Sequence, residues 1–279
     1  MSEQPIFHEQ TEADLMRFAS RMPHALGMYG DEGIGLLTAA TFLSTKAGAR
    51  MSVVYPEKND SVDIEKGTIT IEIVRRLYVH TQGKSRERQC VIIVAADTMS
   101  QAAQNAFLKL LEEPTHNTSF ILLAHHSARL LPTIRSRLQT QYIRPITTGQ
   151  SGLLLDHLGV SDTVKRQQLL FMADGLPSRL TKLARDEGYF NAQAALLRQA
   201  RTYIQGSPYE RLLIAQEHKG SRVDAIQLVG YAVAIMKHAV TTQESITDDM
   251  ASLMVKLLDA LERLEGNGNP RLVLARVIF

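Results

Sequence analysis

A glycine-rich segment near the N-terminus has the spacing of a phosphate-binding loop. Residues 30–38 read Gly-Asp-Glu-Gly-Ile-Gly-Leu-Leu-Thr and lie between an apolar run and a helical pattern. The pattern of such loops, G-x-x-x-x-G-K-[ST], uses its lysine to hold the β- and γ-phosphates and its hydroxyl to bind magnesium. Gly30 and Gly35 occupy the glycine positions, but Leu36 and Leu37 replace the lysine and the hydroxyl residue. The segment therefore predicts a strand-to-helix turn without productive ATP binding, and we expect no cofactor.

A second position required for the same chemistry has also lost its reactive residues. In P-loop ATPases a buried strand ends in acidic residues that hold magnesium and activate water. The apolar run from Val91 to Ala96 predicts this strand, and the two acids would fall at Val94 and Ala95. Asp97 follows two residues later, and we interpret it as a turn or helix-entry residue. Hydrolysis by this chain alone is therefore predicted to be absent.

The other residues with reactive side chains predict no metal site. Cys90 is the single cysteine, which excludes an internal disulfide and a cysteine-based zinc site. It precedes an apolar run, so a buried and unreactive thiol is predicted. His125 and His126 are adjacent but have no acidic or cysteine partner at a ligand spacing. We interpret these histidines as surface groups or as groups that support a neighbouring site.

The first half of the chain alternates between strand and helix patterns, which predicts a parallel α/β sheet with flanking helices. A continuous apolar run is typical of a parallel strand covered on both faces. Thr11 and Asp14 predict a capping box for a first helix. Residues 57–67 are interpreted as a loop, residues 82–88 as a charged turn, and Pro114 as the end of a helix. Strands are predicted at 25–29, 51–55, 91–96 and 120–124, and helices at 36–47, about 69–77 and 103–111.

The pattern changes near Pro145, beyond which only helices are predicted. Short helices are expected around 153–158, 168–172 and 180–184, and longer ones from residue 190 to the end. Ser207 and Pro208 form a helix start with proline at the first helical position. This layout predicts three domains, at residues 1–146, 147–188 and 189–279.

The overall composition is that of an ordinary globular protein. The 279 residues are 44% hydrophobic and 22% charged, and the net charge is +2. Charge therefore indicates neither a nucleic-acid nor a membrane partner. Since the N-terminus lacks a signal-peptide pattern and no window approaches ~18 continuous apolar residues, we expect a cytoplasmic protein without a membrane span.

The segment from Gln104 to Arg137 resembles the AAA+ clamp-loader subunits of bacterial DNA polymerase III. It contains Leu-Leu-Glu-Glu-Pro at 110–114, Phe-Ile-Leu at 120–122 and Leu-Leu-Pro-Thr-Ile-Arg-Ser-Arg at 130–137. The resemblance implies an AAA+ α/β domain, a helical lid and a C-terminal collar bundle that mediates oligomerisation. In that family gamma/tau is the ATPase and delta-prime is often inactive, so the degenerate loop favours a delta-prime-like subunit.

The resemblance also assigns roles to individual residues. Ser136-Arg137-Leu138 corresponds to a Ser-Arg-Cys motif, whose arginine reaches ATP bound by a neighbouring subunit. A guanidinium there would stabilise charge on the γ-phosphate as an arginine finger. Arg135 is interpreted as structural, and Arg179 falls where the lid carries a sensor arginine. The zinc module common in the family has neither room nor ligands in residues 48–55.

The partners implied by the resemblance are gamma/tau and delta subunits in a hetero-oligomeric ring, the sliding clamp and, indirectly, primer-template DNA. The function expected is that of a non-catalytic subunit that helps load the clamp during DNA replication. Two alternatives stay open on the residues alone. One is a gamma/tau-like ATPase with an atypical nucleotide site, and the other is a helical adaptor outside replication.

Overall fold

The computed structural model describes residues 4–278 except 65, 82–86, 113–116 and 243–246. The contacts divide the chain into two compact units, residues 1–181 and 182–279. The predicted helical lid lies in the first unit as far as Thr181, whereas the predicted collar lies in the second. The boundaries at residues 146 and 188 stay a prediction.

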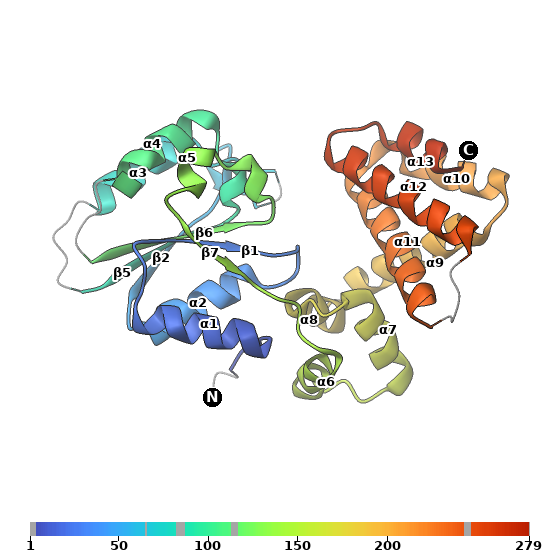
Figure 1. The fold of residues 1–279 in the computed structure, drawn as a ribbon, viewed down its shortest axis with the longest axis horizontal. Helices are drawn as coiled ribbons and strands as arrows, with labels where there is room; N and C mark the ends of the chain where they lie inside the picture. The colour runs from blue at the N-terminus through green and yellow to red at the C-terminus, as the bar shows by residue number, and fades with distance from the viewer. Residues whose placement is uncertain (1–3, 65, 82–86, 113–116, 243–246, 279) are drawn as a thin grey trace. The chain divides into compact units, whose positions relative to one another are not determined.

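A five-stranded parallel sheet forms the centre of the first unit. Its order is β2-β5-β6-β1-β7, so consecutive strands are joined by crossovers. This confirms the predicted fold class, because helices flank both faces of the sheet (Figure 1). The strands are β1 (Ala25–Tyr29), β2 (Arg50–Val54), β5 (Gln89–Ile93), β6 (Thr118–Ala124) and β7 (Gln139–Tyr142).

Two hydrophobic clusters hold the helices on the two faces of the sheet. On one face, α3 (Ile71–Thr81), α4 (Gln101–Glu112) and α5 (Pro132–Arg135) pack on a cluster that contains Phe107 and Phe120. On the other, α1 (Glu9–Ser20) and α2 (Leu36–Lys46) pack on a cluster that contains Leu26 and Leu43. Strand β6 lies inside the sheet between these two groups of helices, and all seven of its residues are buried, as is usual for a parallel strand covered on both faces.

Three expectations about local structure need correction. Thr11 does not cap the first helix, because α1 is capped by the His8 side chain and Thr11 Oγ1 instead accepts a hydrogen bond from the Arg144 backbone N–H at 3.1 Å. The segment predicted as a loop contains a short antiparallel hairpin of β3 (Glu57–Lys58) and β4 (Ser61–Val62). Edge strand β7 was not predicted, because its polar residues lack an apolar run. The expectations for Pro114 and for most of 82–88 lie outside the described residues.

The helices that complete the first unit follow β7. They are α6 (Thr148–His157), α7 (Thr163–Ala173) and α8 (Pro177–Arg185), the last of which extends into the second unit. Thr147 and Gln150 form a capping box at the start of α6. The Gln150 side chain also donates to the Phe7 carbonyl oxygen at 2.8 Å. This hydrogen bond links α6 to the N-terminal segment of the same unit.

The second unit is a helical bundle, as the sequence predicts. It comprises α9 (Glu187–Gln205), α10 (Pro208–Glu217), α11 (Arg222–Thr242), α12 (Asp248–Glu265) and α13 (Pro270–Ile278). The segment 222–240 of α11 is long and apolar enough to cross a membrane, judged on length and composition alone. In this bundle α11 packs against α9 and α12, and Leu228, Val229 and Ala232 are buried. A core helix of a bundle meets the same criterion.

The buried thiol of Cys90 gives a direct test of the packing under the sheet. Cys90 is fully buried, its sulfur accepts a hydrogen bond from Ser44 Oγ at 3.0 Å, and burial raises its pKa to about 11. Because the thiolate is the nucleophile, we expect no reaction with Ellman's reagent at pH 8 in the folded chain and full reaction after denaturation. Rapid labelling of the native protein would show that this face of the sheet opens.

Candidate functional site

The glycine-rich loop joins β1 to α2, as the spacing of Gly30 and Gly35 predicts. The loop turns through two glycines in the left-handed region, Gly33 at φ +91° and Gly35 at φ +88°. The Ile34 backbone N–H donates to the Asp31 carbonyl at 3.0 Å and closes the turn. Helix α2 then begins at Leu36. The backbone therefore has the strand–loop–helix form of a phosphate-binding segment.

Helix α8 of the same unit packs on this loop through its N-terminus. The backbone N–H groups of Ser178 and Arg179 both donate to the Gly33 carbonyl oxygen, at 2.9 and 3.0 Å. The first N–H groups of a helix have no partner within the helix, and here the loop supplies one acceptor for two of them. A methyl group at Gly33 would lie 2.8 Å from Arg179 Cβ, and one at Gly35 would lie 2.8 Å from Ser178 Oγ. Protein atoms therefore cover the loop at both glycines.

The two leucines that replace the motif residues belong to the hydrophobic interior. Leu36 is 6% exposed and lies in the same cluster as Ile34 and Leu176, and Leu37 packs against that cluster from a half-buried position. Thr38, one position beyond the place of the motif's hydroxyl residue, is exposed. The start of α2 thus offers apolar carbon where the motif requires a cation and a magnesium ligand.

The end of β5 offers no carboxylate at the two motif positions. Val94 and Ala95 follow the last strand residue, and Ala95 takes the left-handed conformation at φ 49°. The Ala95 carbonyl oxygen accepts from both the backbone N–H and the hydroxyl of Thr98, at 2.9 and 2.8 Å. Asp97 lies in the turn that follows, and its Oδ2 accepts from the His126 N–H at 3.1 Å. Asp97 is therefore a turn residue, as the sequence predicts.

His125 links the end of β6 to the glycine loop. Its Nδ1 lies 2.7 Å from the Gly30 carbonyl oxygen. A carbonyl can only accept, so Nδ1 carries the proton in this contact. Over the part of the chain that the structure describes, no group of three or more His, Cys, Asp or Glu side chains is arranged to hold a metal ion. The histidine thus supports the loop through a hydrogen bond.

Arg137 lies just after α5, and its contacts are to residues outside the glycine loop. Its guanidinium donates to the Thr133 carbonyl at 2.9 Å and forms an ion pair with Glu112 at 2.8 Å. The arginine side chain is 40% exposed and the glutamate side chain 52% exposed. An exposed ion pair of this kind contributes about 0–1 kcal/mol, so release of the guanidinium costs little free energy.

The neighbours of Arg137 have local structural roles. Ser136 Oγ donates to the same Thr133 carbonyl at 3.1 Å, so it helps to terminate α5. Burial raises the pKa of the Tyr29 phenol, and the positive charge of Arg135 partly offsets that effect. The structural role predicted for Arg135 stays a prediction.

The sequence motifs did not predict the contact between α8 and the loop. Pro177 is a recognisable signal for the first residue of a helix, because proline needs no hydrogen-bond partner for its nitrogen. That signal locates the start of α8 but not its neighbour. Only the folded chain brings Gly33 to Ser178 and Arg179, which are separated from it by more than half of the sequence.

Residues 49–147 match the family model described as DNA polymerase III, delta subunit. The chain is 31% identical to the delta-prime subunit of DNA polymerase III from Haemophilus influenzae over 178 residues, which is 62% of this chain and 54% of the relative. It is 24% identical to the Bacillus subtilis delta-prime subunit over 89% of this chain and 88% of the relative. Replication factor C subunit 5 of Mus musculus is 26% identical over 63% of this chain and 51% of the relative.

The chain thus spans about half the length of the first curated relatives that it matches. Among solved structures, a gamma-subunit-related protein of DNA polymerase III from Thermotoga maritima superposes with a TM-score of 0.53, at 18% identity and over 97% of both chains. A RuvB variant from the same organism gives a TM-score of 0.50 at 12% identity, over 75% of this chain and 79% of RuvB. Together with the parallel sheet, these likenesses identify the fold as AAA+.

Gly33 should be far less tolerant of substitution than another glycine with a positive φ. Gly48 has φ +62°, and a methyl group there would contact nothing within 4 Å. We expect Gly48→Ala to lower the free energy of unfolding by about 1 kcal/mol through backbone strain. Gly33→Ala adds a clash with Arg179 Cβ and should cost roughly 2–4 kcal/mol.

Urea unfolding of both variants, followed by far-UV circular dichroism, measures this difference. Equal destabilisation by the two substitutions would mean that α8 does not press on the loop in solution.

Proposed function

We propose that this relative of the bacterial clamp-loader delta-prime subunits acts in DNA replication as a subunit that does not hydrolyse ATP itself. It would assemble with gamma/tau-like and delta-like subunits in a hetero-oligomeric ring in the cytoplasm. There it would help to load the sliding clamp on primed DNA, with the helical bundle at 189–279 as its oligomerising collar. The similarity to delta-prime proteins over most of the chain supports this assignment.

One observation carries the part of the proposal that concerns catalysis. The glycine loop hydrogen-bonds to α8 through Gly33, and its helix begins with a buried leucine. A triphosphate with magnesium needs a lysine, a hydroxyl and a carboxylate in this place. Leu36, Leu37, Val94 and Ala95 supply none of these groups. The loop therefore serves as an internal support for α8, and the chain binds no nucleotide of its own.

Arg137 is the residue proposed to act on a neighbour's ATP. It lies on the surface of the first unit, and its ion pair with Glu112 is exposed and readily exchanged for a phosphate. A guanidinium can bind phosphate oxygens through two parallel hydrogen bonds, which hold its positive charge in a defined position beside the phosphate. The ion pair with Glu112 would hold the guanidinium at the end of α4 until a neighbouring subunit presents its nucleotide. Ser136 would orient this segment through its bond to Thr133.

A gamma/tau-like ATPase is the second candidate, because the glycine loop retains the strand–loop–helix backbone and the fold matches a gamma-subunit-related protein. ATP turnover by the purified chain distinguishes the two readings, since turnover without partners would favour the ATPase. A helical adaptor outside replication would fail to co-purify with clamp-loader subunits.

Replacing Arg137 should slow ATP hydrolysis by the assembled complex without disturbing assembly. We expect Arg137→Ala to lower the rate at the site it serves by about 10³-fold or more, which is the effect typical of such arginines. Glu112→Gln is the matched control, because it removes the ion pair but leaves the guanidinium. Single-turnover hydrolysis by the reconstituted complex measures both. An unchanged rate in Arg137→Ala would exclude the arginine-finger role.

Restoring the lysine alone should not restore nucleotide binding. In Leu36→Lys the new ammonium group would replace a buried side chain, and burying its charge is unfavourable. Leu37, Val94 and Ala95 would still provide no magnesium ligand. We expect no measurable ATP affinity below about 1 mM by isothermal titration calorimetry. Tight, magnesium-dependent binding by this variant would contradict the proposal that the site is closed.

A further inference from the structure

Strand β2 is a poorly covered edge strand of the sheet. It lies at the end of the strand order and pairs only with β5. Arg50, Met51 and Ser52 are exposed, whereas strands of a parallel sheet are normally covered on both faces. β5 and β6 separate β2 from β1 and its glycine loop. This edge is therefore distinct from the site considered above.

The hydrogen-bonding pattern of β2 leaves one set of backbone groups facing outward. Arg50 N–H donates to the Arg88 carbonyl, and the Val54 carbonyl accepts from Val94 N–H. In a parallel pair, alternate residues direct their N–H and C=O groups toward the partner strand. The backbone groups of Met51 and Val53 therefore point to the opposite edge, where no strand among the described residues pairs with them. Such an edge is a template for another extended chain.

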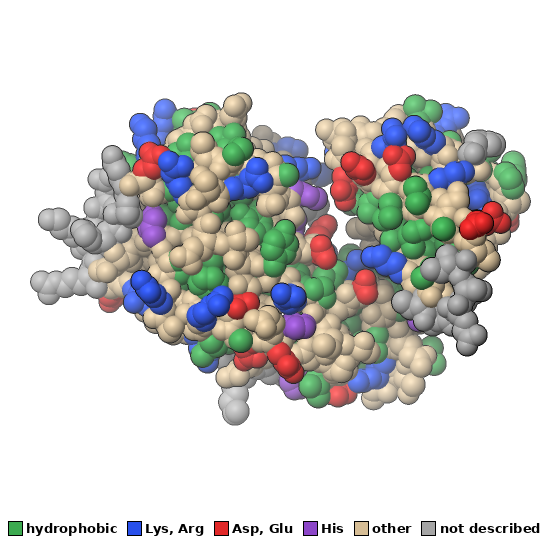
Figure 2. Space-filling model, in the orientation of Figure 1, with side chains coloured by type: hydrophobic (Ala, Val, Ile, Leu, Met, Phe, Trp, Pro, Cys, Tyr) green, Lys and Arg blue, Asp and Glu red, His purple; other side chains and the backbone are tan. Residues whose placement is uncertain are grey.

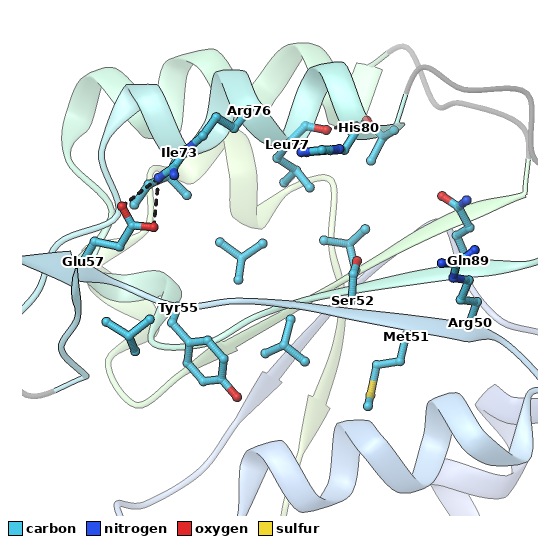
Figure 3. A pocket seen from close by; sticks show the side chains of 15 residues that line it. Arg50, Met51, Ser52, Tyr55, Glu57, Ile73, Arg76, Leu77, His80 and Gln89 are labelled. Atoms are coloured by element: carbon cyan, nitrogen blue, oxygen red, sulfur yellow. Dashed lines mark hydrogen bonds and ion pairs between the residues drawn. The ribbon is translucent and has the colours of Figure 1, made fainter. Parts of the chain in front are cut away.

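A groove of about 470 Å³ runs along this edge between β2 and α3 (Figure 3). The exposed Val62 and the half-buried Val54 supply accessible apolar lining, and the buried side chains of Ile73 and Leu77 lie behind them. Ser52 points into the space below α3 in the same view, and Met51 points away from it. The groove thus combines open backbone groups with apolar surface for alternate side chains.

The charged groups that line the groove are predominantly basic. Arg76 is neutralised by Glu57, which accepts two hydrogen bonds from it at 2.9 and 2.7 Å. Arg50 lines the groove, is exposed, and forms no ion pair with a described residue, and His80 lies on the α3 side. The uncompensated charge at the Arg50 end is positive, which complements a carboxylate.

We propose that this groove binds an extended acidic peptide segment of a partner protein, which adds to β2 as a further strand. Backbone groups of the peptide would bond to Met51 and Val53, alternate apolar side chains would enter the groove, and a carboxylate would pair with Arg50. The inference is independent of the function proposed above. A nucleic acid fits the groove less well, because one uncompensated guanidinium does not form the basic track along which a phosphate backbone binds.

Binding can be measured with a fluorescein-labelled peptide of alternating valine and glutamate, titrated with the full chain. We expect saturable anisotropy, about tenfold weaker binding of a peptide with lysine in place of glutamate, and no competition by a single-stranded oligonucleotide. Addition of the acidic peptide should also slow amide hydrogen exchange at Met51 and Val53. No binding up to about 1 mM, equal binding of both peptides, or binding of the oligonucleotide alone would overturn the proposal.

Two matched pairs of variants test the contacts separately. Met51→Pro removes an N–H that faces the open edge, whereas Met51→Ala keeps it, so only the proline should weaken binding, by about tenfold. Arg50→Glu should weaken binding of the acidic peptide, whereas Arg75→Glu, a matched charge change on α3 outside the groove lining, should not. Loss of binding in both members of a pair, or in neither, would contradict the assigned contact. The exchange measurement on the unmodified chain decides the question if Met51→Pro does not fold.

Discussion

The contact between the Gly33 carbonyl oxygen and the first turn of α8 is the constraint on which the candidate site depends. Two helix N–H groups share this acceptor at 2.9 and 3.0 Å. The positive end of a helix favours negative charge, and here that charge is the partial charge of a carbonyl within the same chain. The left-handed glycines make the approach possible, because a side chain at either position would collide with α8. A segment with the backbone form of a phosphate-binding loop thus makes a close packing contact with α8.

The hydrophobic cluster behind the loop explains why that contact is stable. Leu36 occupies the place of a lysine, and burying an apolar side chain of this size contributes roughly 1.5–3 kcal/mol. A lysine there would have to remain near solvent or lose its charge. The leucine at the motif's lysine position therefore contributes to the packing of α2. The same apolar side chain that lacks the charge of the motif's lysine thus also packs the loop against the interior.

Surface groups of the same unit are held much less firmly. Arg137 and Arg50 are both exposed, and the ion pair of Arg137 is close to energetically neutral. Groups of this kind can change partners at little cost in stability. The buried loop and the exposed arginines thus differ in how firmly the surrounding protein holds them. At the edge strand β2, backbone N–H and C=O groups also face outward without a partner strand among the described residues.

The sequence alone determined the parallel sheet and the helical second unit, because continuous apolar runs and 3.6-residue periodicity are local signals. It also located Gly30, Gly35, Leu36 and the strand end near Val94, since motif spacing is read along the chain. Tertiary structure decided the rest. The polar strand β7, the partner of Thr11, the ion pair of Arg137 and the closure of α8 on the loop all join residues distant in sequence. Such contacts depend on packing and shared hydrogen bonds, which no local pattern encodes.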